Sequence, residues 1–380
     1  IYSAAGAKLR LDKIAKRLPG FKKSISEIKS KKQDTSYPVV TYTVLDNFVP
    51  YVREDIEKGQ TARAIMQLSD MEKMADKLQK ELKAVSTGKT KLPLVPRWTG
   101  VERPTIKSSS LIAPALVPGQ RSPLPRAIFF TGYGHFSQVI KDIEKFRDYG
   151  TNIIQIETGP SATFPKDGDP DLTSINSIKK TLDRCEKAGV AMNLLISPHY
   201  MPDWMFAKYP EIKVKRDGFQ QYCLHAPETL DIVKKHIQAI IPVIKDHPAL
   251  QSICLSNEPI NTEESCKYAQ QDWEQWLIAK HGDIATLNSR WGTEYKSFMD
   301  APLPNPFKAE DKEPAGRWID FIKFNQDFFA NWHKELADAV HAIAPDLPVH
   351  AKAMTWTFAG EAEVKFGVEA YKFGTFSNMN

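Results

Sequence analysis

A rhythm that repeats four times between residues 126 and 258 constrains the fold more than any other feature of the sequence. In each repeat a short apolar run ends in polar or aromatic residues, and a stretch of helical periodicity or a loop follows. The apolar runs cover residues 127–131, 152–156, 191–196 and 252–255. Strands that alternate with helices in this way predict βα units and a parallel sheet.

Polar and aromatic side chains gather at one end of each predicted strand. Tyr133 follows the first strand, Glu157 ends the second, and His199 and Tyr200 follow the third. Such side chains at the carboxyl ends of the strands are typical of a (β/α)8 barrel. A doubly wound dinucleotide fold would more often show Gly-x-Gly-x-x-Gly after its first strand, and here the third glycine is missing. We therefore expect an α/β protein with a (β/α)8 TIM barrel.

The fourth apolar run leads directly into Asn257-Glu258-Pro259. Pro259 has no N–H for a sheet ladder, so we expect the strand to stop at Glu258. An amide and a carboxyl group then lie side by side at the end of a buried strand, and a carboxyl group among apolar neighbours can hold a proton near neutral pH. Glu258 is therefore a candidate acid catalyst. The alternative is a loop carboxylate that caps the next helix.

The rest of the chain supplies fewer strands than a closed barrel requires. Residues 259–348 show helical periodicity and loops, and the fifth predicted strand is 349–354. Residues 374–380 resemble the beginning of a sixth strand. We therefore expect the barrel domain, residues 123–380, to contain strands one to about six, with the last repeats missing from this chain.

Residues 1–122 differ from the barrel in their pattern. Apolar residues recur at three- and four-residue steps between Val52 and Ala84, which predicts one long amphipathic helix. This helix either packs on the main domain or makes a homo-oligomer. Residues 85–125 contain seven prolines and predict an extended connector or short strands. We place a domain boundary near residue 122, after an N-terminal helical and proline-rich extension.

Charge and hydropathy restrict the partners of the chain. The net charge is +5, and ten Lys and Arg side chains face only Asp12 and Glu27 in the first 32 residues. Because no recognition motif accompanies them, we expect a solvated basic helix and no nucleic-acid partner. No run approaches the 18 or so apolar residues of a membrane span, so we expect no membrane partner.

The four cysteines, Cys185, Cys223, Cys254 and Cys266, lie far apart in the sequence. Without a Cys-x-x-Cys pair, neither a metal knuckle nor a disulfide framework is expected. Cys254 falls inside a predicted core strand and should be a small buried hydrophobe. The small residues 4–7 resemble the tail of a secretory signal, which slightly favours a secreted or periplasmic protein over a cytoplasmic one.

Residues 126–300 as a group resemble the clan A glycoside hydrolases, and most closely the family 42 β-galactosidases and their relatives. Three passages carry the resemblance, and their combination is more specific than any one of them. They are Gly134-His135-Phe136 with Asn152–Glu157, Ser197–Trp204 with Tyr209-Pro210, and Ser256–Pro259 with Trp276-Leu277 and Leu287–Thr293.

This resemblance implies a retaining glycosidase that cleaves a β-galactoside or a related plant or algal glycan. It implies that Glu258 is the acid/base and that Asn257 binds the 2-hydroxyl of the cleaved sugar. The nucleophile would be a second glutamate at the end of strand seven, which we expect beyond Asn380. The chain departs from the family at Pro259, where an aromatic residue is usual, in its lack of a zinc-binding cysteine cluster, and in residues 1–122.

Aromatic side chains near the strand ends fit a carbohydrate site, because sugar faces stack on rings while polar groups bind hydroxyls. Any one of these residues can instead belong to the core. The expected substrate-binding residues are Asn257, His199, Tyr200, Glu157, Tyr133, Trp204 and Trp356.

Two other functions remain open from the sequence. One is a catalytically inactive barrel that binds carbohydrate or acts as a scaffold, because it has no nucleophile. The other is a metal-dependent hydrolase, for which His135 and His199 could supply two ligands. Since no His-x-His or Glu-x-x-His spacing occurs, we expect no metal and no cofactor.

Overall fold

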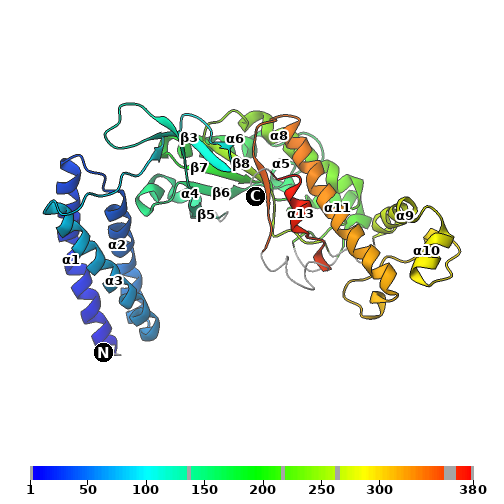
Figure 1. Cartoon of the computed structure of the whole chain (residues 1–380), viewed down its shortest axis with the longest axis horizontal. Helices are drawn as coiled ribbons and strands as arrows, with labels where there is room; N and C mark the ends of the chain where they lie inside the picture. The colour runs from blue at the N-terminus through cyan, green and yellow to red at the C-terminus, as the bar shows by residue number, and fades with distance from the viewer. Residues whose placement is uncertain (1–2, 135–137, 215–218, 262–265, 355–364, 378–380) are drawn as a thin grey trace. The chain divides into compact units, whose positions relative to one another are not determined.

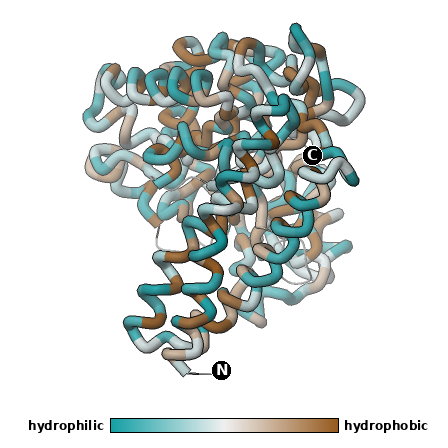
Figure 2. Tube along the Cα trace, turned by 90° about the vertical axis from the view of Figure 1, so that its left-hand side faces the viewer, coloured by the Kyte–Doolittle hydropathy of each residue, from teal (hydrophilic) through white to brown (hydrophobic). Residues whose placement is uncertain are grey.

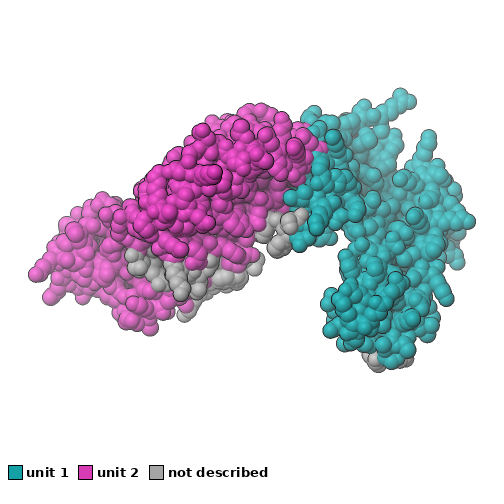
Figure 3. All heavy atoms as spheres, turned by 180° about the vertical axis from the view of Figure 1, so that it is seen from behind, with its two compact units in different colours: residues 1–133, 138–154, 184–191 teal, residues 134–137, 155–183, 192–380 magenta. Residues whose placement is uncertain are grey.

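The computed structural model describes residues 3–134, 138–214, 219–261, 266–354 and 365–377. The chain divides into two compact units, which are coloured separately in Figure 3. The first unit contains residues 1–133, 138–154 and 184–191, and the second contains residues 134–137, 155–183 and 192–380. The domain boundary expected near residue 122 stays a prediction.

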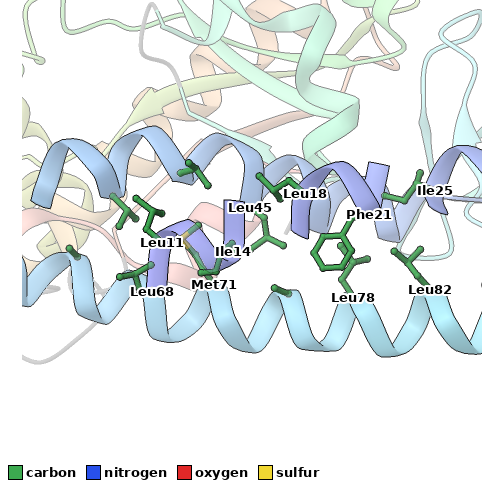
Figure 4. Close-up of a cluster of buried hydrophobic side chains, with 14 of the residues drawn as sticks. Leu11, Ile14, Leu18, Phe21, Ile25, Leu45, Leu68, Met71, Leu78 and Leu82 are labelled. Carbon is green, nitrogen blue, oxygen red and sulfur yellow. The ribbon is translucent and has the colours of Figure 1, made fainter. Parts of the chain in front are cut away.

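Three long helices open the first unit: α1 (Ala4–Ser30), α2 (Ser36–Glu57) and α3 (Thr61–Ser86). Apolar and polar segments alternate along these helices (Figure 2), so that each buries one face. Leu11, Ile14 and Phe21 of α1 meet Leu68 and Leu78 of α3 in the shared core (Figure 4). Each helix thus supplies one apolar side of a three-helix bundle.

The single long helix expected between Val52 and Ala84 is in fact two helices. α2 ends at Glu57, and α3 begins at Thr61. Gly59 lies between them at φ +74°, a left-handed conformation that glycine adopts without steric cost. The apolar period continues across this break because both helices face the same bundle core.

Basic residues of α1 are partly paired with acidic residues of α3. The Arg10 guanidinium lies 2.8 Å from the Glu72 carboxylate, and Arg17 lies 2.7 Å from Asp76. These ion pairs help to explain why the basic N-terminal segment forms a solvated helix within a bundle.

A small antiparallel sheet follows the bundle, as expected for residues 85–125. Its strands are β1 (Arg97–Trp98), β2 (Thr105–Lys107), β3 (Ser110–Leu116) and β4 (Leu124–Ala127). β3 pairs with each of the other three.

A five-stranded sheet with the order β5-β6-β7-β8-β9 carries the βα repeats. Figure 1 labels β5, β6, β7 and β8 of this sheet. The pairs β5–β6, β7–β8 and β8–β9 are parallel. The strands are β5 (Gly132–Tyr133), β6 (Ile153–Glu157), β7 (Ala191–Leu195), β8 (Leu250–Asn257) and β9 (Val349–Lys352). β8 and β9 are therefore the fourth and fifth strands of this sheet, as the sequence predicts.

Helices and short helical turns connect the strands. Between β5 and β6 lie α4 (Gln138–Lys141) and the 3-10 helix η1 (Ile143–Tyr149), and between β6 and β7 lie α5 (Pro160–Thr163) and α6 (Leu172–Ala188). Between β7 and β8 are α7 (Asp203–Lys208), η2 (Pro210–Ile212) and α8 (Pro227–Ile244). The long passage to β9 contains α9 (Lys267–His281), α10 (Ile284–Trp291), η3 (Phe298–Asp300), η4 (Glu310–Lys312) and α11 (Ala315–His341).

Two strands expected from the sequence are placed differently. The segment predicted as strand 127–131 contributes Ala127 to β4, which pairs with β3, and the parallel sheet begins only at β5. The predicted sixth strand, 374–380, starts at the end of α13 (Ala370–Gly374), and residues 375–377 are not a strand. The Glu369 side chain begins this helix by accepting bonds from the N–H groups of Tyr371 and Lys372. Residues 378–380 lie outside the described residues.

The spacing of the cysteines predicts no disulfide framework, but one disulfide is present, between Cys223 and Cys266. They lie 43 residues apart, in the loop before α8 and at the residue that precedes α9. Cys185 and Cys254 are free and buried, and burial raises the pKa of each thiol to about 12. Cys254 is thus the buried small hydrophobe that the sequence predicts.

Within the described residues, no helix has the length and apolar content needed to cross a membrane.

Candidate functional site

The carboxyl end of β8 carries Asn257, and the half-buried Glu258 follows it. Every residue of β8 is buried. Glu258 adopts φ +48°, in the left-handed region that is costly for a residue with a side chain. Its backbone N–H donates to the Lys352 carbonyl on β9 at 2.7 Å. The strand end is therefore held in a strained turn at the candidate acid.

A buried histidine fixes the strand two residues before Glu258. The Nε2 atom of His333, on α11, lies 2.7 Å from the Ser256 hydroxyl, and its Nδ1 lies 2.9 Å from the Phe329 carbonyl. Burial lowers the pKa of His333 to about 4, so the ring is neutral near pH 7. Nδ1–H therefore donates to Phe329, and Nε2 accepts the Ser256 hydroxyl proton.

The side-chain oxygen of Asn257 is available for a further hydrogen bond. Asn257 is 5% exposed, and its Oδ1 has no donor among the described residues. Among the described residues, the buried hydroxyls of Thr158, after β6, and Ser197, after β7, also have no hydrogen-bond partner. Buried polar atoms in proteins are normally paired. At three neighbouring strand ends, a buried polar atom is therefore available for a hydrogen bond that the described residues do not provide.

Glu157 and Tyr200 interact directly at the ends of β6 and β7. The Tyr200 hydroxyl donates to Glu157 Oε1 at 3.2 Å. Burial and the neighbouring carboxylate of Glu157 raise the pKa of Tyr200. Tyr200 is therefore a neutral hydrogen-bond donor near pH 7, with 47% of its surface exposed.

A pocket of about 440 Å³ opens beside this pair. The ring of Phe219 stacks on His199 at 4.7 Å between centroids, which gives the pocket a flat apolar wall. A flat wall with polar groups beside it suits a sugar ring. The pocket is lined by Ser161, Pro165, His199, Tyr200, Met201, Pro202, Asp203, Phe206, Phe219, Gln221 and Tyr222.

The remaining predicted residues are placed as follows. Trp204 donates its indole N–H to the Phe164 carbonyl at 2.9 Å and does not line the pocket in the described structure. Tyr133 belongs to the first unit, where its ring lies 5.7 Å from Phe146. Trp356 lies outside the described residues, as does His135. Asn257 and Glu258 end the neighbouring strand and are not among the lining residues.

A polar network inside the sheet was not anticipated from the sequence. Gln155 Nε2 donates to Asn193 Oδ1 at 2.5 Å, and Asn193 Nδ2 lies 2.5 Å from Ser252 Oγ. His350 Nε2 lies 2.9 Å from the same Nδ2, so it accepts, and burial lowers the pKa of this histidine. The signal in the sequence is a polar residue inside an apolar run, such as Gln155 between isoleucines or Asn193 between Met192 and Leu194.

Phe219 was also missed, because it lies in a long loop with no periodicity that could assign it to a site. Across the parts of the chain that the structure describes, no three His, Cys, Asp or Glu side chains are grouped so that they could hold a metal ion.

Residues 134–374 match the family model of glycoside hydrolase family 42, described as β-galactosidase. β-Galactosidase LacZ of Heyndrickxia coagulans is 24% identical over 227 residues, which are 56% of this chain and 34% of that protein. BgaB of a Geobacillus strain is 25% identical over 229 residues, with the same coverage. The chain thus spans about a third of the length of these curated relatives.

Solved structures show the same fold. An exo-carrageenase of family 42 from Bacteroides ovatus matches with a TM-score of 0.74 and 18% identity, over 97% of this chain and 52% of that one. A β-galactosidase from Marinomonas ef1 matches with a TM-score of 0.55 and 18% identity, over 65% of this chain and 40% of that one. The expected α/β fold of the (β/α)8 barrel type is confirmed, and this chain holds a part of it.

Proposed function

Since this chain belongs to glycoside hydrolase family 42, we propose that it hydrolyses β-glycosidic bonds of a β-galactoside-like substrate, with retention of configuration. The observation that carries the proposal is the strained Glu258 at the carboxyl end of β8, beside an Asn257 whose buried Oδ1 has no donor among the described residues. Catalytic groups of barrel enzymes lie at this end of the strands.

Such a reaction uses two carboxyl groups with different roles. Glu258 protonates the glycosidic oxygen as the leaving group departs, and afterwards takes a proton from the attacking water. A second carboxylate attacks the anomeric carbon from the opposite face and forms the glycosyl-enzyme intermediate. Asn257 Oδ1 would accept a hydrogen bond from the 2-hydroxyl of the sugar.

The second carboxylate is proposed to lie beyond Asn380. Retaining enzymes hold their two carboxyl groups about 5–5.5 Å apart, with the substrate between them. Among the described residues that follow β9, Glu369 is engaged as the cap of α13. β9 itself lies directly beside β8, so a carboxylate at its end would be a neighbour of Glu258 along the sheet. Glu361 and Glu363 lie outside the described residues.

A galactan is the substrate class that the similarities favour. The curated relatives are named β-galactosidases, but they match 56% of this chain. The structure of the exo-carrageenase matches 97% of it, including the N-terminal helices and the small sheet. Carrageenan is a sulfated galactan. A galactose-containing polymer that carries anionic groups is therefore the substrate we would test first.

The proposed location is outside the cytoplasm. The Cys223–Cys266 bond supports this, because disulfides persist mainly in secreted and periplasmic proteins.

The test compares two leaving groups in a longer protein that contains this chain. In Glu258→Ala, kcat/KM should fall about 10³-fold on an aryl β-galactoside with a poor leaving group, because acid assistance is lost. With a dinitrophenyl leaving group, kcat/KM should be nearly retained. Azide should then restore turnover and yield the β-galactosyl azide.

Exposed Glu294→Gln is the control and should behave as the unsubstituted protein. Equal losses of kcat/KM on both substrates would contradict the role of Glu258. Binding of galactan oligosaccharides without any turnover by the unsubstituted protein would favour the alternative, an inactive carbohydrate-binding barrel.

A further inference from the structure

The first unit contains a second pocket, of about 570 Å³, which the proposed reaction does not use. It is lined from the end of α1 and the loop after it, from β1, from the turn after β3, from η1 and from the residues before β7. Five cationic side chains line it, against the two carboxylates of Asp34 and Glu186. These cations are Lys29, Lys32, Arg97, Arg147 and Lys187.

Arg147 is the most deeply placed of these cations. Arg147 is half-buried, and burial, together with the nearby charge of Arg97, lowers its pKa. Gly189 makes room for it, since a Cβ at that position would lie 2.5 Å from Arg147 Nη1. Within the described residues, Arg147 forms no ion pair and no side-chain hydrogen bond. A desolvated guanidinium of this kind favours an anionic ligand.

The carboxylate of Asp34 is already engaged in the local fold. Its Oδ1 accepts from the N–H and the hydroxyl of Ser36, and its Oδ2 accepts from the Val95 N–H at 2.7 Å. Burial opposes ionisation, but these bonds prevail and lower the pKa of Asp34. Arg97 lies 3.9 Å from this carboxylate and also donates to the Ser36 hydroxyl.

Three exposed lysines add positive charge to the lining. For Lys29, Lys32 and Lys187, the described residues provide no side-chain acceptor. The pocket therefore keeps an excess of positive charge after its internal contacts are formed. The charge of Arg97 disfavours that of Arg147, and an anion between the two guanidinium groups would relieve this repulsion.

We propose that this pocket binds a tetrahedral oxyanion, a sulfate or phosphate group, between Arg147 and Arg97. A planar guanidinium donates two parallel hydrogen bonds to such a group. The pocket is larger than one oxyanion and lies in the size range of small-molecule sites, so a sugar ring that carries the anion as an ester can enter it. The oxyanion can thus be free or carried on a glycan.

The residues that line this pocket belong to the first unit, whereas Glu157, Ser197 and Glu258 belong to the second. Arg147 precedes β6 and Gly189 precedes β7, whereas Glu157 and Ser197 lie at the carboxyl ends of the same strands. The inference therefore does not rest on the proposed hydrolysis. A nucleic acid is the less suitable ligand, because Trp98, the aromatic residue in the lining, is 2% exposed and cannot stack on a base.

The test is calorimetric titration of the whole protein at low ionic strength. The ligands are sodium sulfate, sodium phosphate, a sulfated galactan oligosaccharide and its desulfated counterpart, with sodium chloride at matched ionic strength. At least one oxyanion-bearing ligand should bind, and Arg147→Met should raise its Kd at least tenfold. The exposed Arg53→Met variant of α2 is the matched control and should leave Kd unchanged.

A second variant tests the site in case Arg147→Met fails to fold. Lys29→Met/Lys32→Met changes two exposed side chains and should raise Kd about threefold or more while leaving circular dichroism and Tm unchanged. Binding of inorganic sulfate or phosphate would identify a free-ion site, and binding of the sulfated oligosaccharide alone would identify a glycan site.

The absence of binding by every oxyanion would overturn the proposal. Equal binding by the desulfated oligosaccharide, or a Kd that is unchanged in both variants, would do the same. Tighter binding of an oligonucleotide of matched charge would also overturn it, in favour of a nucleic-acid surface. Failure of the hydrolysis assay would leave all of these outcomes unaffected.

Discussion

The Lys352 side chain, on β9, donates to Gln155 Oε1, on β6, at 3.3 Å. β7 and β8 lie between these strands in the sheet. In a flat sheet, three strand spacings would separate them by about 14 Å, and side chains that stand roughly perpendicular to the sheet would not meet across that distance. The direct contact therefore requires the sheet to curl toward its own interior face, as the strands of a barrel do. The interior of that curve is polar, because the contact continues into the network around Asn193.

The first prediction concerns this interior network. Asn193→Ala should lower the free energy of unfolding by about 3 kcal/mol, because the buried polar groups of Gln155, Ser252 and His350 lose their shared partner. Urea unfolding at pH 7 measures the change. The exposed Asn176→Ala on α6 is the matched control and should stay within about 0.5 kcal/mol of the unsubstituted protein. A loss below about 1 kcal/mol at Asn193 would show that the network adds little.

The second prediction concerns the Cys223–Cys266 bond. Replacement of both cysteines by serine should lower the free energy of unfolding by about 4 kcal/mol, since the bond closes a loop between residues 43 apart in the unfolded chain. Urea unfolding of the oxidised protein and of the double variant gives the difference. Addition of a reductant should destabilise the unsubstituted protein and leave the variant unchanged. Equal stability of the two proteins would argue against the bond.

The third prediction is a loss of stability between pH 7 and pH 5. Burial lowers the pKa of His236 and of His333 to about 4. Below pH 6.5 the unfolded state therefore binds protons that the folded state does not, and stability is lost as the pH falls toward 4. Each histidine should contribute about 2 kcal/mol of loss over this interval.

Urea unfolding at the two pH values measures this loss, and His333→Gln should remove about 2 kcal/mol of it. Carboxyl groups with lowered pKa, such as Glu144 beside Arg184, titrate mainly below this window. An unchanged pH dependence in His333→Gln would mean that this ring is not the source.

The sequence predicts the repeated part of this fold well, because apolar period and chain order are local properties. The strands β6 to β9 and the carboxyl ends that hold Glu157 and Asn257 follow from such runs. What the sequence misses depends on contacts between distant segments. Cys223 meets Cys266 only after the loop folds, and Phe219 reaches His199 in the same way. The break at Gly59 is hidden because both helices face one core.

The fourth prediction concerns the nucleophile. The 380-residue chain should not hydrolyse an aryl β-galactoside. A chain extended at its C-terminus to the full length of its relatives should hydrolyse it. Acid catalysis by Glu258 alone cannot form the glycosyl-enzyme intermediate. Steady-state assays of the two proteins, both shown to be folded by circular dichroism, make the comparison. Comparable activity from the shorter chain, lost in Glu361→Ala, would place the nucleophile within residues 1–380.

The final prediction separates strain from catalysis at Glu258. Its φ of +48° is unfavourable for glutamate and for glutamine, but asparagine tolerates the left-handed region better. Glu258→Asn should therefore be more stable than Glu258→Gln by about 0.5–1 kcal/mol, and both should lose the acid/base function. Urea unfolding of the two variants gives the stability difference, and hydrolysis of an aryl β-galactoside with a poor leaving group gives the activity of the extended protein. If the Glu258→Asn variant is no more stable than the Glu258→Gln variant, the backbone at Glu258 is not strained. If either variant keeps full activity, another residue donates the proton.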